Sequence, residues 1–299
     1  MLSFIDGKYV QLPFNFTSIL ELIGNRQGKI VIDKLRKQYP FESRVSIYEL
    51  MTCSDRDISD YAKLLYAKAF ETYISKMWNL PPQKISKDVI NRVKICMGFD
   101  GRYLNRDFQF LPSNGFFELI TNMLTHPNIR VQTNFDALKH ISFSKGKCLF
   151  DGDPEVLIVF TGPIDELASE RFGRLPYRSL LFDISYFNQI RALPEEIVSL
   201  PQDPKLIRKT EYKYFNIFKG DFSEHKTVVV SETPVDYGPS TVPCYPVIND
   251  ENVAKYQLYK NEMSQYSNLI LCGRLAEYKY YNMDQVILHA LDVSKQLLS

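Results

Sequence analysis

Two short apolar segments constrain the fold of this 299-residue chain more than any other feature. Residues Val156 to Phe160 form a continuous apolar run that ends at Thr161-Gly162-Pro163, and a second run covers Asn268 to Cys272. Such runs, which lack alternation, are typical of strands buried on both faces, as in a parallel sheet. The second run leads through Gly273-Arg274 into a helix expected over roughly Met283 to Leu298. Together they predict an α/β fold.

Signals before these segments are different. Asp6-Gly7 lies between two short extended stretches and predicts a hairpin over residues 4 to 14. From Thr17 to Trp78 the pattern is helical, with Gly24 ending one helix and carboxylates suited to the first turn of another that begins near Ser54. A small helical bundle is therefore expected in this part of the chain.

A short helix and three further strands are expected in the middle of the chain. The helix covers Phe116 to Leu124. The strands show a more alternating pattern, which favours antiparallel pairing. They cover Tyr177 to Phe187, Tyr212 to Phe218 and Thr227 to Thr233.

Charge and composition argue against several classes of function. The 36 basic residues balance 35 acidic ones, whereas a dedicated nucleic-acid binder usually carries a basic excess. No apolar run approaches the ~20 residues that cross a bilayer, so no membrane insertion is expected. Five cysteines without CxxC spacing indicate a reducing cytoplasm and argue against a disulfide framework or a zinc site. The four histidines pair with no cysteine at ligand spacing, so no metal is predicted.

Tyrosine is unusually frequent, with 19 residues. A tyrosine ring is apolar and its hydroxyl is polar, so it can fill a core or line a wet pocket. The composition leaves open a tyrosine-rich core and a site where several phenols converge.

The segment from Gly273 to Gln285 is the best candidate for a site. It places an arginine, a lysine and three tyrosines between a strand and the start of a helix. Main-chain N–H groups at a helix start favour an anion, and an arginine adds a second contact. The segment could hold a phosphate or diphosphate, or it could be a polar loop with tyrosines packed beneath it.

Six segments in the same order resemble the UDP-galactopyranose mutases, and they run from the first residues to the last helix. The most specific is TGPIDELASERFGRLPYRSL, and the last is GRLAEYKYYNMDQVI. The six are Leu12–Asn15, Tyr73–Trp78, Phe99–Pro112, Thr161–Leu180, Cys244–Val247 and Gly273–Ile287.

The resemblance implies an isomerase that interconverts UDP-galactopyranose and UDP-galactofuranose. In that family the N5 atom of reduced FAD attacks the anomeric carbon of galactose and displaces UDP, and the resulting adduct lets the sugar open and reclose as a five-membered ring. The implied role is supply of galactofuranose for a surface polysaccharide such as lipopolysaccharide O-antigen, capsule or cell wall.

The resemblance also implies roles for individual residues. Arg92, Arg208 and Arg274 align with arginines that act on the diphosphate or lie near flavin and substrate, so they are the predicted catalytic residues. The predicted substrate contacts are Tyr103, Tyr245 and Tyr280 at the diphosphate, Tyr73 on uracil, Trp78 beside the sugar, and Asn282. The predicted FAD contacts are Gly162, Pro163, Arg274, Met283 and Asp284.

The chain departs from the family pattern at several points. Asn282 stands where the family usually has Asp, and Leu167-Ala168 replaces an aromatic pair. Family members begin with a glycine-rich strand–turn–helix unit for the FAD pyrophosphate, and this sequence contains no GxGxxG. We therefore expect FAD binding by this chain alone to be incomplete, and the last strand and helix to expose apolar side chains.

The expected architecture is α/β, with an incomplete Rossmann-like FAD-binding domain, a small helical bundle and an antiparallel sheet domain. The bundle takes residues 16–95. The sheet domain takes 1–15, 96–112 and 164–267. The rest of the FAD domain takes 113–163 and 268–299.

Three alternatives to an active cytoplasmic mutase remain at this stage. They are an inactive truncated remnant, a UDP-sugar-binding module without redox chemistry, and an amine-oxidase-like flavoenzyme. The resemblance also leaves a homodimer open.

Overall fold

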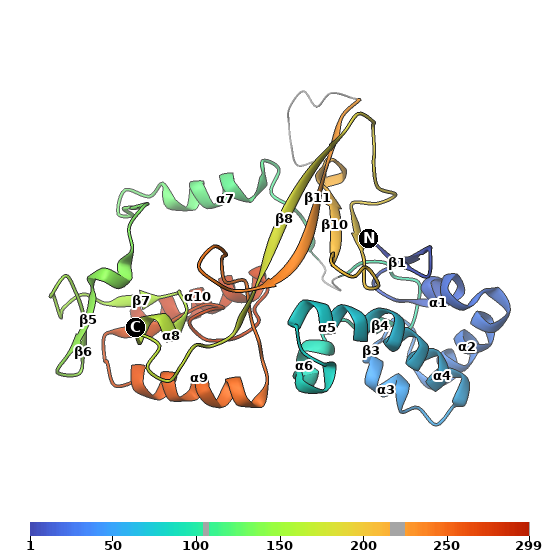
Figure 1. Ribbon diagram of the computed structural model, residues 1–299, viewed down its shortest axis with the longest axis horizontal. Helices are drawn as coiled ribbons and strands as arrows, with labels where there is room; N and C mark the ends of the chain where they lie inside the picture. Colours follow the sequence, from blue (N-terminus) through green and yellow to red (C-terminus); the bar gives the residue numbers. More distant parts are fainter. Residues whose placement is uncertain (104–107, 216–224, 299) are drawn as a thin grey trace. The chain divides into compact units, whose positions relative to one another are not determined.

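The computed structural model describes residues 1–103, 108–215 and 225–298. It is a mixed α/β structure that divides into two compact units (Figure 1). The first unit contains residues 1–82, 90–131 and 181–234, and the second contains 83–89, 132–180 and 235–299. Both units are discontinuous in sequence. The three-domain division expected from the sequence stays a prediction.

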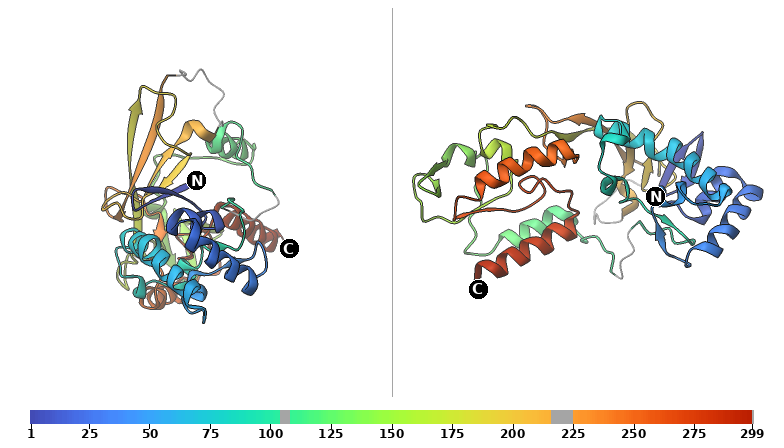
Figure 2. Two further views of the ribbon diagram at one scale, coloured as in Figure 1. Left: turned by 90° about the vertical axis from the view of Figure 1, so that its right-hand side faces the viewer. Right: turned by 90° about the horizontal axis from the view of Figure 1, so that it is seen from below.

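Helices in the first part of the chain pack against one another (Figure 2). Asn15 caps the first of them, because its side chain accepts from the Ser18 N–H while the Ser18 hydroxyl accepts from the Asn15 N–H. Asp55 caps a later helix, because its carboxylate accepts from the N–H groups of Asp57 and Ile58. These elements are α1 (Phe16–Ile23), α2 (Asn25–Gln38), α3 (Ile47–Met51), α4 (Arg56–Leu65), the π-helix η1 (Tyr66–Glu71) and α5 (Thr72–Trp78).

A seven-stranded mixed sheet runs in the order β12-β8-β11-β10-β9-β1-β2. The predicted hairpin is confirmed, with β1 and β2 paired antiparallel across Asp6 and Gly7, which both have positive φ. β9 joins β1 in parallel and β10 antiparallel. The strands are β1 (Leu2–Ile5), β2 (Lys8–Gln11), β8 (Tyr177–Phe187), β9 (Ile197–Ser199), β10 (Arg208–Glu211), β11 (Thr227–Asp236) and β12 (Tyr245–Pro246).

The second unit is built around a core that includes several tyrosines. Tyr177, Tyr259 and Tyr278 are buried there with Ile164 and Met263. Its elements are the 3-10 helix η3 (Ala137–His140), β5 (Ile141–Ser144), β6 (Lys147–Phe150), β7 (Ile158–Phe160), α8 (Ile164–Leu167), α9 (Asp250–Met263), β13 (Leu269–Leu271) and α10 (Met283–Leu298), together with β12 and parts of β8 and β11.

The remaining short elements belong to connecting segments. η2 (Pro82–Lys84) and α6 (Lys87–Ile90) lie where the chain passes between the units. The others are β3 (Arg44–Val45), which pairs with β4 (Ile95–Cys96), then α7 (Gly115–Leu124) and the 3-10 helix η4 (Tyr212–Phe215).

Two sequence predictions are corrected. β7 and β13 do pair in parallel, but they form a two-stranded sheet and are not buried on both faces, since Val159 is 46% exposed. The strand expected over Tyr212–Phe218 is wrong in its described part, where η4 forms after β10. Residues 216–218 lie outside the described residues. Glu211, at the end of β10, binds the N–H groups of Ala192 and Leu193, and the chain turns there.

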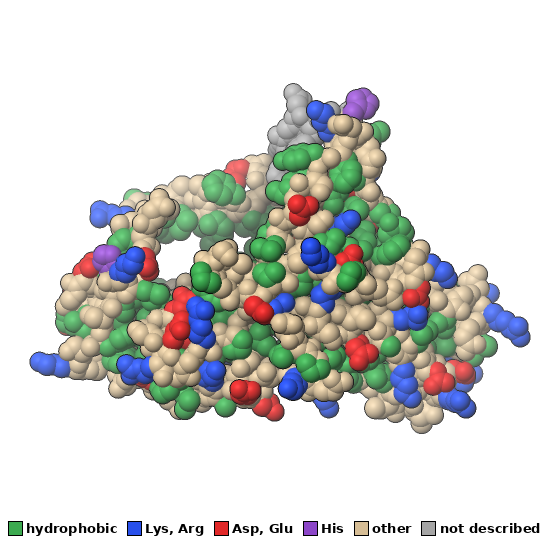
Figure 3. Space-filling view, viewed as in Figure 1, with side chains coloured by type: hydrophobic (Ala, Val, Ile, Leu, Met, Phe, Trp, Pro, Cys, Tyr) green, Lys and Arg blue, Asp and Glu red, His purple; other side chains and the backbone are tan. Residues whose placement is uncertain are grey.

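Several elements expose apolar side chains, among them α7, β8 and α10, and Figure 3 shows them in green along β8. In β8, Phe182, Ile184 and Tyr186 are 55 to 80% exposed. In α10, Leu288 and Leu291 are more than half exposed. Exposure of apolar residues on the last helix was expected from the sequence. Among the described residues, no helix is both long and apolar enough to cross a bilayer.

Candidate functional site

Arg274 is the fixed cation of the segment that the sequence singled out. It follows β13 and Gly273, whose φ of 102° lets the chain turn sharply. The guanidinium donates from Nη1 to the Cys244 carbonyl at 2.9 Å and from Nε to the Tyr281 carbonyl at 3.1 Å. A second bond from Nη2 also reaches Tyr281. Main-chain oxygens from two segments therefore orient this side chain.

Two predicted substrate residues flank Arg274. The rings of Tyr245, on β12, and Tyr280 are stacked with centroids 5.4 Å apart and an interplanar angle of 18°. The Arg274 guanidinium carbon lies 5.2 Å from the first ring centroid and 5.0 Å from the second. A guanidinium beside two phenol rings is a suitable group for binding a diphosphate, because its charge combines with hydroxyl donors.

The carboxyl ends of β7 and β13 meet at one edge of their parallel pair. Phe160 is in register with Leu271, and the Cys272 N–H donates to the Phe160 carbonyl at 3.0 Å. The segment with Gly162 and Pro163 therefore leaves the same edge as Arg274. This edge is where open α/β sheets bind their ligands.

Asn282, Met283 and Asp284 lie at the start of α10. The Asn282 N–H donates to the Gln285 side chain at 2.9 Å, and Met283 and Asp284 are exposed. The Leu167-Ala168 departure lies in the core of the second unit, where both residues are buried.

Five predicted residues lie in the first unit. Arg208, on β10, pairs through Nε with Glu232 at 2.6 Å, its cross-strand partner on β11. Arg92 is exposed in the turn after α6. Tyr73 and Trp78 lie on α5, half-buried and buried respectively, and Tyr103 is 48% exposed.

Lys76 connects two of these positions and was missed by the sequence reasoning. From α5 its ammonium donates to four carbonyls of the loop before β10, including Leu200 at 2.8 Å and Leu206 at 2.5 Å. Burial lowers the pKa of Lys76 to about 8. The helix that carries Tyr73 and Trp78 is thus tied to the loop that leads to Arg208.

Arg178 is a second residue that sequence reasoning missed. It is 3% exposed, pairs with Asp236, and faces Tyr245 across the β8–β12 pair. Directly opposed side chains in an antiparallel pair share a face of the sheet. An arginine inside the PYRS segment, at the start of an expected strand, was the available signal.

Some tyrosines fill the core, and others lie at the candidate site. Tyr278 is core: its hydroxyl lies 2.7 Å from the Pro176 carbonyl and 3.0 Å from that of Val247, and burial raises its pKa. Tyr280 belongs to the Arg274 cluster. Tyr281 donates to Glu277 at 3.2 Å. The loop between β13 and α10 is therefore part packing and part candidate binding surface.

A family model described as UDP-galactopyranose mutase matches residues 68–280. Among relatives, the UDP-galactopyranose mutase of Mycoplasma genitalium is 33% identical over 295 residues, which cover 96% of this chain and 72% of the relative. That of Mycoplasma pneumoniae is 30% identical, with 96% and 73% covered. The chain belongs to the UDP-galactopyranose mutase family.

A third relative is named for a different nucleotide sugar. The dTDP-fucopyranose mutase of Escherichia coli is 26% identical over 293 residues, which cover 97% of this chain and 74% of the relative.

Proposed function

We propose that this chain is a UDP-galactopyranose mutase that interconverts UDP-galactopyranose and UDP-galactofuranose for a surface polysaccharide. The observation that carries the proposal is the Arg274 guanidinium, held by main-chain carbonyls beside the stacked rings of Tyr245 and Tyr280. A leaving UDP carries charge on its diphosphate, and a fixed cation with phenol donors stabilises that charge. The family match supports the choice of substrate.

In this proposal Arg274, Tyr245 and Tyr280 bind the diphosphate. Arg208, which pairs with Glu232, is a further proposed diphosphate contact. Arg92 and Tyr103 contribute from exposed loops. Tyr73 stacks on uracil, and Trp78 borders the sugar.

The residues at the β7–β13 edge fit one side of a flavin site. Pro163 is buried and precedes α8, and Gly162 and Arg274 leave the same edge. Met283 and Asp284 present exposed side chains at the start of α10. Reduced FAD, when bound there, supplies the nucleophile for the anomeric carbon, while these residues position it and Asn282 lies beside them.

The test is conversion of UDP-galactofuranose to UDP-galactopyranose, followed by chromatography, with added FAD and dithionite. We expect turnover that requires the reductant. Arg274→Ala should lower kcat/KM by roughly 100-fold or more, because a donor to developing charge is lost. Arg56→Ala is the control, since Arg56 is 93% exposed on α4. Absence of turnover with reduced FAD would contradict the proposal.

Binding measurements separate the alternatives. Calorimetry with UDP and with dTDP asks which nucleotide the chain recognises, because one relative is named for a dTDP sugar. UDP binding without turnover would favour a UDP-sugar-binding module. Tighter binding of dTDP than of UDP would favour a mutase that acts on a dTDP sugar. We further propose a cytoplasmic location, in keeping with five free cysteines, and a homodimer, which sedimentation would test.

A further inference from the structure

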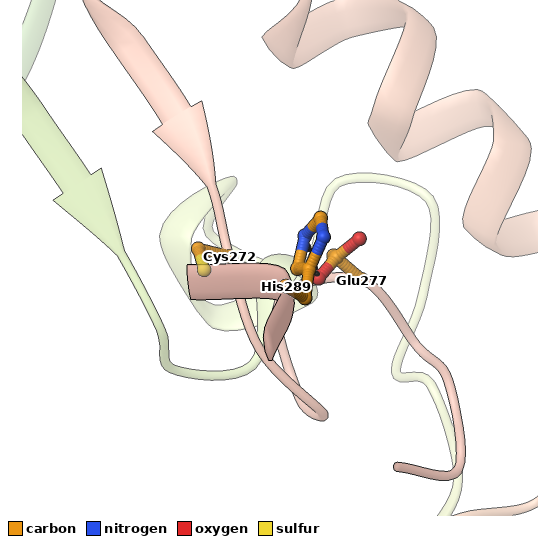
Figure 4. Close-up of side chains that lie close together, drawn as sticks. All are labelled: Cys272, Glu277 and His289. Atoms are coloured by element: carbon orange, nitrogen blue, oxygen red, sulfur yellow. Dashed lines mark ion pairs between the residues drawn. The ribbon is translucent and has the colours of Figure 1, made fainter. Parts of the chain in front are cut away.

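Three side chains of different chemistry converge beside the loop that carries Arg274. Cys272 follows β13, Glu277 lies in the turn after it, and His289 lies on α10 (Figure 4). One ligand atom from each, a sulfur, an oxygen and a nitrogen, lies within 4.8 Å of the others. Cys272 and Glu277 are 6% and 9% exposed, and His289 is half-buried. The sequence did not indicate the group, because His289 lies on a separate helix, 12 positions after Glu277 and 17 after Cys272.

The histidine nitrogen lacks a well-formed hydrogen bond. His289 Nε2 lies 2.9 Å from Glu277 Oε2, yet it is buried and makes no hydrogen bond of acceptable geometry among the described residues. Both groups therefore have capacity for a third partner. A buried polar atom of this kind usually has an explanation, and a bound ion is one of them.

We propose that Cys272, Glu277 and His289 bind one divalent transition-metal ion, with zinc as the best match. Thiolate sulfur, imidazole nitrogen and carboxylate oxygen are each typical ligands of zinc in proteins. Tetrahedral ligands of zinc lie about 3.3 to 3.8 Å apart, which small side-chain rotations would reach from this arrangement. A thiolate and a carboxylate carry two negative charges and a neutral imidazole none, so with a 2+ ion the buried site carries no net charge.

Neighbouring groups already orient two of the ligands. The Gly273 N–H donates to Glu277 Oε2 at 2.9 Å, and the Tyr281 hydroxyl donates to Oε1 at 3.2 Å. The Tyr281 ring stacks on the His289 ring with centroids 5.7 Å apart. Such contacts fix ligand direction and raise metal affinity. The partial exposure of His289 leaves a fourth position for water.

The positive charge of nearby Lys279 should weaken binding of the metal ion. Lys279 lies 3.6 Å from Glu277 Oε1 and is 60% exposed. Metal binding must also remove the Cys272 thiol proton, and burial raises the pKa of that thiol. The balanced step is exchange: the S–H bond breaks, the sulfur–metal bond forms, and one proton leaves to solvent.

The test uses the full, tag-free chain after treatment with a chelator, titrated with Zn²⁺ by calorimetry and with Co²⁺ by absorbance. We expect one ion per chain, a near-ultraviolet thiolate-to-cobalt band, and release of about one thiol proton per ion, read from buffers of different ionisation enthalpy. Cys272→Ser should remove the band, and His289→Ala should weaken Zn²⁺ binding by about tenfold or more. Lys279→Ala should strengthen it.

Matched controls separate this site from stray binding. Cys148→Ser removes another buried thiol of the same unit, and His140→Ala removes another histidine of that unit. Both should bind like the parent chain. The proposal is overturned by the absence of stoichiometric binding, by cobalt absorbance without a thiolate band, or by equal affinity in His289→Ala. If a variant fails to fold, zero proton release in the parent chain is also decisive against the site.

Discussion

Buried polar side chains in this molecule are satisfied mainly by the main chain. Glu211 is fully buried and accepts from the N–H groups of Ala192 and Leu193, as well as from the Thr227 hydroxyl at 2.5 Å. Lys76 and Arg274 donate in turn to main-chain carbonyls. Removing such a side chain leaves several main-chain groups without partners, which costs more than the bond itself.

Asp100 should make stability depend on acid pH. Hydrogen bonds from Arg102 lower its pKa from 3.8 to about 2, and Arg44 lies 3.1 Å away. The unfolded chain therefore binds more protons below about pH 4, and the free energy of unfolding falls as pH drops through that window. Asp100→Asn should destabilise by about 1 kcal/mol or less at pH 7.

Thermal melting between pH 5 and 3 measures this effect. The difference between the parent chain and Asp100→Asn should shrink as pH falls. Asp60→Asn is the control, because its carboxylate is 61% exposed and pairs only along a helix surface with Arg56. A difference that stays constant with pH would exclude the assigned titration.

Tyr278→Phe should destabilise the second unit by about 1 to 2 kcal/mol, because the carbonyls of Pro176 and Val247 lose a donor while the ring packing is kept. Urea denaturation measures the change. Tyr186→Phe, at an 80% exposed position, should be neutral. Equal midpoints for the two variants would show that the hydroxyl contributes nothing.

Whole elements are joined by side chains that replace strand pairing. Asn268 precedes β13 and donates through Nδ2 to the carbonyls of Cys148, Pro154 and Val156. Its Oδ1 accepts from the Cys148 N–H at 2.9 Å. One amide thereby links the β5–β6 hairpin and the start of β7 to β13, and it positions the edge from which Arg274 leaves.

Asn268→Ala should cost about 2 to 4 kcal/mol, since buried main-chain groups in two segments lose partners. Chemical denaturation followed by circular dichroism checks it. Asn261→Ala removes an exposed amide bonded to Gln257 and should change stability by less than about 0.5 kcal/mol. Similar losses in both variants would contradict the linking role.

At the scale of the whole molecule, exposed apolar side chains determine behaviour in solution. In α10 every described residue is at least partly exposed, including Met283, Ile287, Leu288 and Leu291. Apolar surface of this kind binds hydrophobic dyes and promotes association.

The double variant Leu288→Ser, Leu291→Ser should lower the fluorescence of a bound anilinonaphthalene dye and reduce self-association, measured by light scattering. Its melting temperature should change little, because these side chains are more than half exposed. Leu258→Ser, at a 50% exposed position on α9, is the control. Unchanged dye binding would place the dye site elsewhere.

Local signals predicted much of the fold. The hairpin at Asp6-Gly7, the end of α1 at Gly24, and α10 over Met283–Leu298 follow from turn chemistry, caps and periodicity, which act within a few residues. The strands β7 and β13 were predicted as strands typical of a parallel sheet, and they pair in parallel with each other. The exposure of these strands was not predicted, because the exposed fraction of a residue such as Val159 depends on which elements cover the strand.

The sequence by itself determined the family and most of the element types, and it proposed the candidate residues, since these depend on local pattern and ordered motifs. Only the tertiary structure decided which of 19 tyrosines fill the core and which flank Arg274. It also decided that Cys272, Glu277 and His289 meet. The physical reason is that a contact between a strand end, a turn and a helix depends on how they pack, and spacing along the chain carries no record of it.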